Sequence, residues 1–297
     1  MLARWLTRLM DAQAGWVKPL GNVVHRIDHA IFHAMPPIRD LLNGRWLGHP
    51  IHAVLTDVPI GILFLVILFD IVALPAAAGW ALLIGILGMG GAALAGFADY
   101  AETDGLARDR GTLHSTLMVV ALTIYVVDGV LRLGGPEGAP VSALAVGLSV
   151  VAFLVLSAGA YVGGDIVYVL GNMVDRHAFR GGGTKWLALE PAETEADGAI
   201  PEGRPIKAKL GANTLVLVRN GATILALHDT CAHAGCSLSG GTLVEAGGGS
   251  LVECPCHGSR FHLADGHVAR GPSVYDQPAY EVRAREGGGW EARLQGA

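Results

Sequence analysis

Four residues in the C-terminal third of the chain have the types and the spacing that suit a metal centre. A Cys-x-His pair at Cys231 and His233 is followed, after 20 intervening residues, by a Cys-x-x-His pair at Cys254 and His257. Two thiolates and two imidazoles suit tetrahedral zinc or a mixed-ligand iron–sulfur cluster, so the residue types alone leave the metal open. A zinc finger commonly groups a cysteine pair and then a histidine pair, whereas each half here supplies one of each. This favours two loops that clasp a two-iron cluster, with both cysteines on one iron and both histidines on the other.

The sequence around these residues carries further motifs. CAHAGC at 231–236 and CPCHGSRF at 254–261 are followed by GPS at 271–273. Together they resemble the Rieske proteins of cytochrome bc complexes and their cytoplasmic relatives, over about residues 184–297. The resemblance implies one 2Fe-2S cluster per chain, bound by Cys231, His233, Cys254 and His257.

Other site residues follow from the same resemblance. It implies a disulfide between Cys236 and Cys256, shielded from reductant and joining the two loops, although a reducing compartment would favour two free thiols. It also implies that Ser259 donates a hydrogen bond to a bridging sulfide of the cluster. Phe261 departs from the pattern, because high-potential members carry a tyrosine whose hydroxyl bonds a cysteine sulfur. We therefore expect a potential below that of the quinol-oxidising respiratory proteins.

The composition points to a lipid environment. Hydrophobic residues make up 52% of the chain, charged residues make up 16%, and the mean hydropathy is +0.45. A net charge of -5 offers no basic footprint, which sets nucleic-acid binding aside. Four apolar runs approach the length needed to span a bilayer and predict a four-helix membrane bundle. They cover residues 54–74, 79–98, 115–132 and 142–162.

Three segments of this half resemble a bacterial four-helix membrane family known as domain of unknown function 2231. They are LGHPIHAVLTDVPIG, GFADYAETDGLARDRGTLHS and YVGGDIVYVLG, within about residues 45–175. The resemblance implies the fold but little about activity.

Ionisable residues gather near one end of the predicted bundle. Such residues in or beside a membrane segment are costly and indicate a functional site. This possible membrane redox site comprises His49, His52, Asp57, Asp99 and His114. His49 and His52 are three residues apart, which predicts a shared helix face. The group can bind a quinone headgroup, a haem through two histidines, or a proton; alternatively, the histidines only cap helices at headgroup level.

Lysine and arginine counts predict the orientation. Residues 1–48 carry six of these residues, and the link between the second and third spans adds Arg108 and Arg110. The first link has none and the third has only Arg132. We expect a multi-pass protein of the cell membrane with both termini, and hence the cluster domain, on the cytoplasmic side.

These patterns define the expected organisation. An amphipathic lead-in at 1–48 precedes an all-α membrane domain at 49–175, a glycine-rich linker at 176–184 and an all-β Rieske domain at 185–297. The β prediction rests on short alternating runs such as TLVLVRN between glycine-rich turns.

The predicted function is that of a membrane-anchored electron-transfer protein. It would exchange electrons with a quinone, a haem or a redox partner protein, as a component of an oxidoreductase system rather than a self-contained enzyme. The alternatives are an iron–sulfur redox sensor that controls the membrane domain, and a ferredoxin-like component of an oxygenase system.

Overall fold

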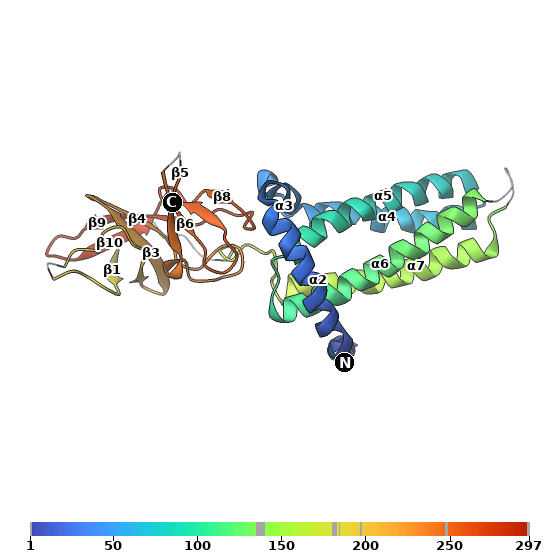
Figure 1. The fold of residues 1–297 in the computed structure, drawn as a ribbon, viewed down its shortest axis with the longest axis horizontal. Helices are drawn as coiled ribbons and strands as arrows, with labels where there is room; N and C mark the ends of the chain where they lie inside the picture. The colour runs from blue at the N-terminus through green and yellow to red at the C-terminus, as the bar shows by residue number, and fades with distance from the viewer. Residues whose placement is uncertain are drawn as a thin grey trace. The chain divides into compact units, whose positions relative to one another are not determined.

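The computed structural model describes residues 2–134, 140–179, 183, 185–196, 198–246 and 249–295. The chain divides into a helical unit, Met1–Asn43 with Pro50–Asn172, and a β unit, Gly44–His49 with Met173–Ala297 (Figure 1). The expected all-α bundle followed by an all-β domain is confirmed. Most of the glycine run in the expected linker lies outside the described residues.

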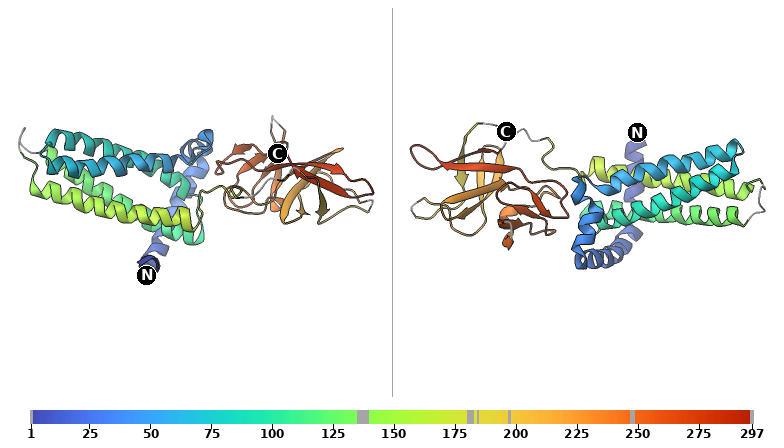
Figure 2. Two further views of the ribbon diagram at one scale, coloured as in Figure 1. Left: turned by 180° about the vertical axis from the view of Figure 1, so that it is seen from behind. Right: turned by 90° about the horizontal axis from the view of Figure 1, so that it is seen from above.

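Four long helices form the body of the helical unit. They are α4 (Ile51–Ile71), α5 (Pro75–Tyr100), α6 (Gly105–Leu133) and α7 (Ala143–Gly164), the last extended by a π-helical turn to Val169. Each is long and apolar enough to cross a membrane. α4 packs against α5 and α7, and α6 packs against the same two helices, so α4 and α6 occupy diagonally opposite corners (Figure 2).

The bundle core is apolar, and a cluster of charges is buried within it. Leu63, Tyr125 and Leu156 are among its best-buried side chains. Arg132, expected in the third link, instead lies inside α6 and donates two hydrogen bonds to Asp70, at 2.8 and 2.7 Å. Mutual neutralisation lets these charges enter the bundle, which hydropathy alone does not anticipate.

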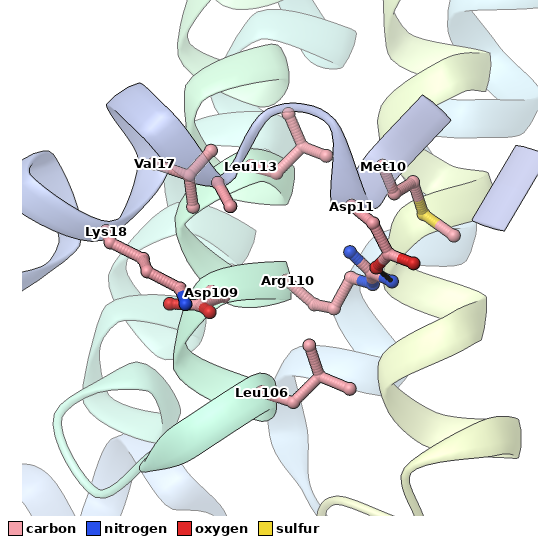
Figure 3. Close-up of a pocket in the computed structure, with 9 residues that line it drawn as sticks. Met10, Asp11, Val17, Lys18, Leu106, Asp109, Arg110 and Leu113 are labelled. Carbon is pink, nitrogen blue, oxygen red and sulfur yellow. Dashed lines mark hydrogen bonds and ion pairs between the residues drawn. The ribbon is translucent and has the colours of Figure 1, made fainter. Parts of the chain in front are cut away.

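Three further helices cross the end of the bundle where α4 and α6 begin (Figure 1). They are α1 (Leu2–Asp11), α2 (Ala14–Ala34) and α3 (Pro36–Asn43). A small pocket separates α1 and α2 from α6, and there Arg110 binds Asp11 at 2.6 Å (Figure 3). Arg110 also binds Asp165 at 3.2 Å, so one buried guanidinium ties the N-terminal helices to the bundle.

The β unit contains two antiparallel sheets. A closed barrel has the strand order β1-β10-β9-β4-β3-β2, and a smaller sheet has the order β5-β6-β7-β8. The barrel strands are β1 (Leu187–Pro191), β2 (Ile206–Leu210), β3 (Asn213–Asn220), β4 (Thr223–His228), β9 (Ala279–Ala284) and β10 (Trp290–Leu294). The smaller sheet comprises β5 (Thr242–Ala246), β6 (Gly249–Glu253), β7 (Arg260–His262) and β8 (Val268–Arg270).

Strand β3 is covered on both faces and joins the two sheets. Leu215 and Leu217 point into the barrel core, whereas Val216 and Val218 pack in a second core with residues of the smaller sheet. This double burial explains why four consecutive residues of β3 are buried, whereas buried and exposed residues alternate in a strand with one face in solvent. The smaller sheet and its loops are thereby fixed against the barrel.

Candidate metal centre

Two loops with the same backbone design carry the predicted ligands. One follows β4 and begins at Cys231, and the other follows β6 and begins at Cys254. Each cysteine carbonyl accepts a hydrogen bond from a glycine four residues on, Gly235 at 2.9 Å and Gly258 at 3.1 Å. Both glycines have positive φ values, 87° and 73°, which favour glycine. Each cysteine N–H also donates to the carbonyl five residues on, at 2.8 Å. The chain therefore builds matching turns that present one Cys and one His each.

The two unpaired cysteines are buried side by side. Cys231 is 1% exposed and Cys254 is 3% exposed, and their thiols share a hydrogen bond. That bond lowers the pKa of Cys254 to about 7 and raises the pKa of Cys231 well above its ordinary value. Backbone N–H groups of His233 and His257, among others, also point at these sulfurs. The site thus stabilises thiolate sulfur, but ionising both thiols together requires a bound cation.

The two predicted histidine ligands also meet. The rings of His233 and His257 are 5.0 Å apart between centroids and nearly perpendicular, at 83°. The Nδ1 atom of His257 is buried and has no hydrogen-bond partner among the described residues. A buried nitrogen without a partner is unfavourable unless something binds it. Two thiols and two imidazoles brought together in this way fit the ligand set of a mixed-ligand 2Fe-2S cluster.

A disulfide joins Cys236 and Cys256 and so links the two loops, as the resemblance implied. The sulfurs of these two residues and of Cys254 lie within 4.8 Å of one another. Disulfide sulfurs are not thiolates, so only Cys254 in this trio remains available to a metal. The expected shielding of the disulfide is wrong, because the Cys256 end is exposed and Cys236 is partly exposed.

Ser259 and Phe261 lie under the second loop. Ser259 is fully buried, and its Oγ accepts a hydrogen bond of 3.0 Å from the N–H of Ser273 in the proline loop. Its hydroxyl proton therefore remains available to a further acceptor. Phe261 is also fully buried, in the core that contains Cys231 and Cys254, where it offers no hydrogen-bond donor.

Two supporting residues were not found by sequence reasoning. Gln277 is buried; its Nε2 donates to the carbonyls of His228 and Thr230, both at 2.6 Å, and its Oε1 accepts from the N–H of Ala232 at 2.9 Å. It thereby fixes the path of the chain on both sides of Cys231. Its partners lie 45 to 49 residues away, so no local pattern marks it.

The second such residue is Asp229. Its carboxylate accepts hydrogen bonds from Ser237 Oγ and from the N–H of Ser239, both at 2.7 Å. Burial raises the pKa of Asp229, but these bonds and Lys207 outweigh burial and bring the pKa below its ordinary value. An ionised Asp229 therefore closes the base of the first loop.

In the helical unit, two of the predicted membrane-site residues come together. The rings of His52 on α4 and His114 on α6 are 6.1 Å apart between centroids. Each Nδ1 bonds a backbone carbonyl at 2.8 Å, that of Ala92 for His52 and that of Gly159 for His114.

The ring contact of this pair involves none of the other three residues. The predicted helix face shared by His49 and His52 is wrong, because α4 begins at Ile51 and His49 lies in the turn before it. Asp57 is exposed on α4. Asp99 is partly buried, and its Oδ1 has no hydrogen-bond partner among the described residues.

A row of three histidines on α2 was missed. His25 and His29 stack at 5.7 Å between centroids, and His29 and His33 lie at 5.4 Å. Their spacing of four residues places them on one helix face, a signal that was available in the sequence.

Comparisons with known proteins match both halves. The family model "Rieske [2Fe-2S] domain" matches residues 191–281, and "Predicted membrane protein (DUF2231)" matches residues 48–176. "Ferredoxin CarAc" of Metapseudomonas resinovorans is 38% identical over 34% of this chain and 88% of the ferredoxin. "Cytochrome b6-f complex iron-sulfur subunit 1" of Synechocystis sp. is 38% identical over 21% of this chain but only 33% of the subunit. Among solved structures, a chain of "Complex of reduced oxygenase and oxidized ferredoxin in carbazole 1,9a-dioxygenase" is 32% identical over 36% of this chain and 92% of that chain, with a TM-score of 0.30.

Proposed function

Because this chain belongs to the Rieske [2Fe-2S] proteins and carries a DUF2231 membrane domain ahead of its cluster domain, we propose that it transfers electrons at a membrane. The observation that carries the proposal is the meeting of two buried free thiols and two histidine rings on matched loops. We assign Cys231 and Cys254 to one iron and His233 and His257 to the other. When bound, the cluster supplies one-electron transfer.

The surrounding residues would set the properties of this centre. Backbone N–H groups directed at the sulfurs of Cys231 and Cys254 compensate thiolate charge, which favours the reduced state. The free hydroxyl proton of Ser259 would act in the same direction toward a bridging sulfide. Phe261 supplies no such donor, which supports a potential below that of tyrosine-containing relatives.

The membrane half would bring the cluster to a bilayer and to a redox partner, which is a quinone, a haem or a partner protein. Four helices with the length and composition of membrane spans support this role. The electron-transfer role also suits a ferredoxin-like component of an oxygenase system, an alternative favoured by the 38% identity to a ferredoxin. A redox sensor is the third reading.

Two observations bear on which side of the membrane holds the cluster. Arg132 is ion-paired inside α6, so the far-side links keep no free lysine or arginine, and the charge bias toward a cytoplasmic cluster domain becomes stronger. The Cys236–Cys256 disulfide, exposed at its Cys256 end, suits an oxidising compartment instead. We retain the cytoplasmic side for the cluster domain.

A Glu286→Cys variant and an impermeant thiol reagent test this orientation. Labelling only in permeabilised cells would support a cytoplasmic cluster domain, and labelling in intact cells would contradict it.

Electron transfer itself is tested by steady-state turnover of the full-length protein in detergent. We expect quinol to reduce the cluster repeatedly when a soluble electron acceptor is present. His257→Ala should abolish this flow, whereas His262→Ala, which changes a histidine outside the assigned ligand set, should preserve it.

The result also separates the three readings. Reduction by a flavoprotein reductase but not by quinol would favour the ferredoxin-like component. A cluster that can be reduced once but sustains no turnover with either donor would refute the carrier function and leave the sensor.

A further inference from the structure

The histidine pair of the bundle joins two helices that do not pack side by side. His52 is on α4 and His114 is on α6, which occupy diagonally opposite corners. Their ring planes are nearly perpendicular, at 83°, with centroids 6.1 Å apart. The two rings therefore meet although they come from helices at opposite corners of the bundle.

The hydrogen bonds of the pair fix how each ring is protonated. A carbonyl oxygen only accepts, so Nδ1 of each ring is the donor toward Ala92 O or Gly159 O. In a neutral ring this leaves the lone pair on Nε2. A backbone carbonyl on Nδ1–H and a lone pair on Nε2 is the usual arrangement of a metal-binding histidine.

The two hairpins of the bundle repeat the same construction. In α5 the bonded carbonyl of Ala92 is followed four residues later by Gly96, and in α7 Gly159 is followed four residues later by Gly163. A Cβ atom on Gly96 would lie 2.8 Å from His52 Cε1, and one on Gly163 would lie 3.1 Å from His114 Cε1. Each imidazole therefore rests against a helix backbone at a glycine, where a Cβ atom would displace the ring of His52 and crowd the ring of His114.

We propose that His52 and His114 bind one transition-metal ion between them through their Nε2 atoms. This inference rests on the proposed electron-transfer function in one respect, because the bound metal would be a redox centre within the membrane half. Metal–nitrogen bonds of about 2.0–2.1 Å on both sides of one ion place the ring centroids about 6 Å apart, and the observed separation is 6.1 Å.

The surroundings narrow the class of ion. A bare dication with two neutral ligands would carry uncompensated charge inside the bundle, which is costly. No carboxylate among the described residues forms a three-residue metal-binding group with this pair. Charge is better balanced in the iron of a haem, whose macrocycle supplies anionic nitrogens, or in a monovalent copper ion. Both use the same chemistry, two opposed imidazoles on one metal.

The experiment measures metal and haem in the full-length protein purified in detergent from cells supplied with haem precursor or with copper. Protein that retains neither ligand is titrated with haemin and, separately, with Cu(I). We expect one equivalent of one of these ligands per chain, with haem showing the spectrum of bis-imidazole low-spin iron. His52→Ala and His114→Ala should lose this binding, whereas His33→Ala, an exposed histidine of the same unit, should keep it.

Two glycine variants test the geometry of the histidine site without removing either proposed ligand. Gly96→Ala should weaken binding about tenfold or more, because its methyl group displaces the ring of His52. Gly91→Ala on the same helix should not, since a Cβ there meets nothing within 4 Å.

Iron–sulfur content, measured in every variant, separates this inference from the proposed function, because the cluster should persist when the bundle metal is lost. Wild-type protein that binds neither haemin nor Cu(I), or His52→Ala and His114→Ala variants that bind as wild type does, would overturn the inference.

Discussion

Gln277→Leu should destabilise the cluster domain although it removes no proposed ligand. Leucine is close to glutamine in size but cannot replace its three hydrogen bonds to His228 O, Thr230 O and Ala232 N. A buried backbone group left without a partner costs about 1–3 kcal/mol. Three such groups give a loss of about 3 kcal/mol at the lower limit.

This loss converts into a measurable shift in melting temperature. For a domain of this size, 1 kcal/mol corresponds to about 4 °C, so the shift should be about 12 °C. The assay follows loss of the visible absorbance of the cluster on heating full-length protein, at one scan rate for all variants. Gln295→Leu is the matched control, because Gln295 is exposed and its side chain takes no part in the loops.

A Gln277→Leu variant that melts within about 3 °C of wild type would contradict this prediction. A shift equal to that of Gln295→Leu would also contradict it, since the bonds to the first cluster loop would then contribute nothing. A large shift accompanied by normal cluster content at low temperature is the expected pattern.

Three further predictions concern other parts of the chain. Phe261→Tyr should raise the midpoint potential in a redox titration by adding a hydroxyl donor near the ligand sulfurs, and a lower potential with the cluster intact would contradict this. Cys236→Ser should still assemble cluster but lose it faster, because the loops are no longer linked; an unchanged rate of loss would count against a stabilising disulfide. Burial, and then the charge of Glu102, raises the pKa of Asp28 to about 7, so its stabilising contribution is complete below about pH 4 and is lost as the pH rises through 7. Asp28→Asn should therefore raise the melting temperature of the helical unit more at pH 8 than at pH 5, and equal shifts at both would refute the assignment.

The cluster loops could be predicted from the sequence because their chemistry is local. Cys231 with His233, and Cys254 with His257, each lie within one short turn, so spacing alone reveals them. Gln277 could not be found in this way, since the bonds that make it important join segments far apart in the chain. Whether Cys256 is exposed likewise depends on how the loops fold, and here the expectation was wrong.

In the membrane half, too, local features could be predicted from the sequence, whereas contacts between distant segments could not. Hydropathy located all four spans, but α6 begins at Gly105, ten residues before the predicted run at 115–132. Arg132 was counted as a link residue because composition cannot reveal its bonds to Asp70. Among the five residues grouped as a possible redox site, His52 and His114 are in ring contact, a pairing that depends on which helices lie diagonally opposite.

The central claim, a cluster with mixed cysteine and histidine ligands, is tested most directly by analysing iron, acid-labile sulfide and zinc in purified full-length protein and recording the EPR spectrum after reduction. The account predicts two irons and two sulfides per chain and the low average g-value of this ligation. His233→Ala and His257→Ala should lose the signal, and His262→Ala should keep it. Stoichiometric zinc without iron, or a cluster that survives in both ligand variants, would contradict the account.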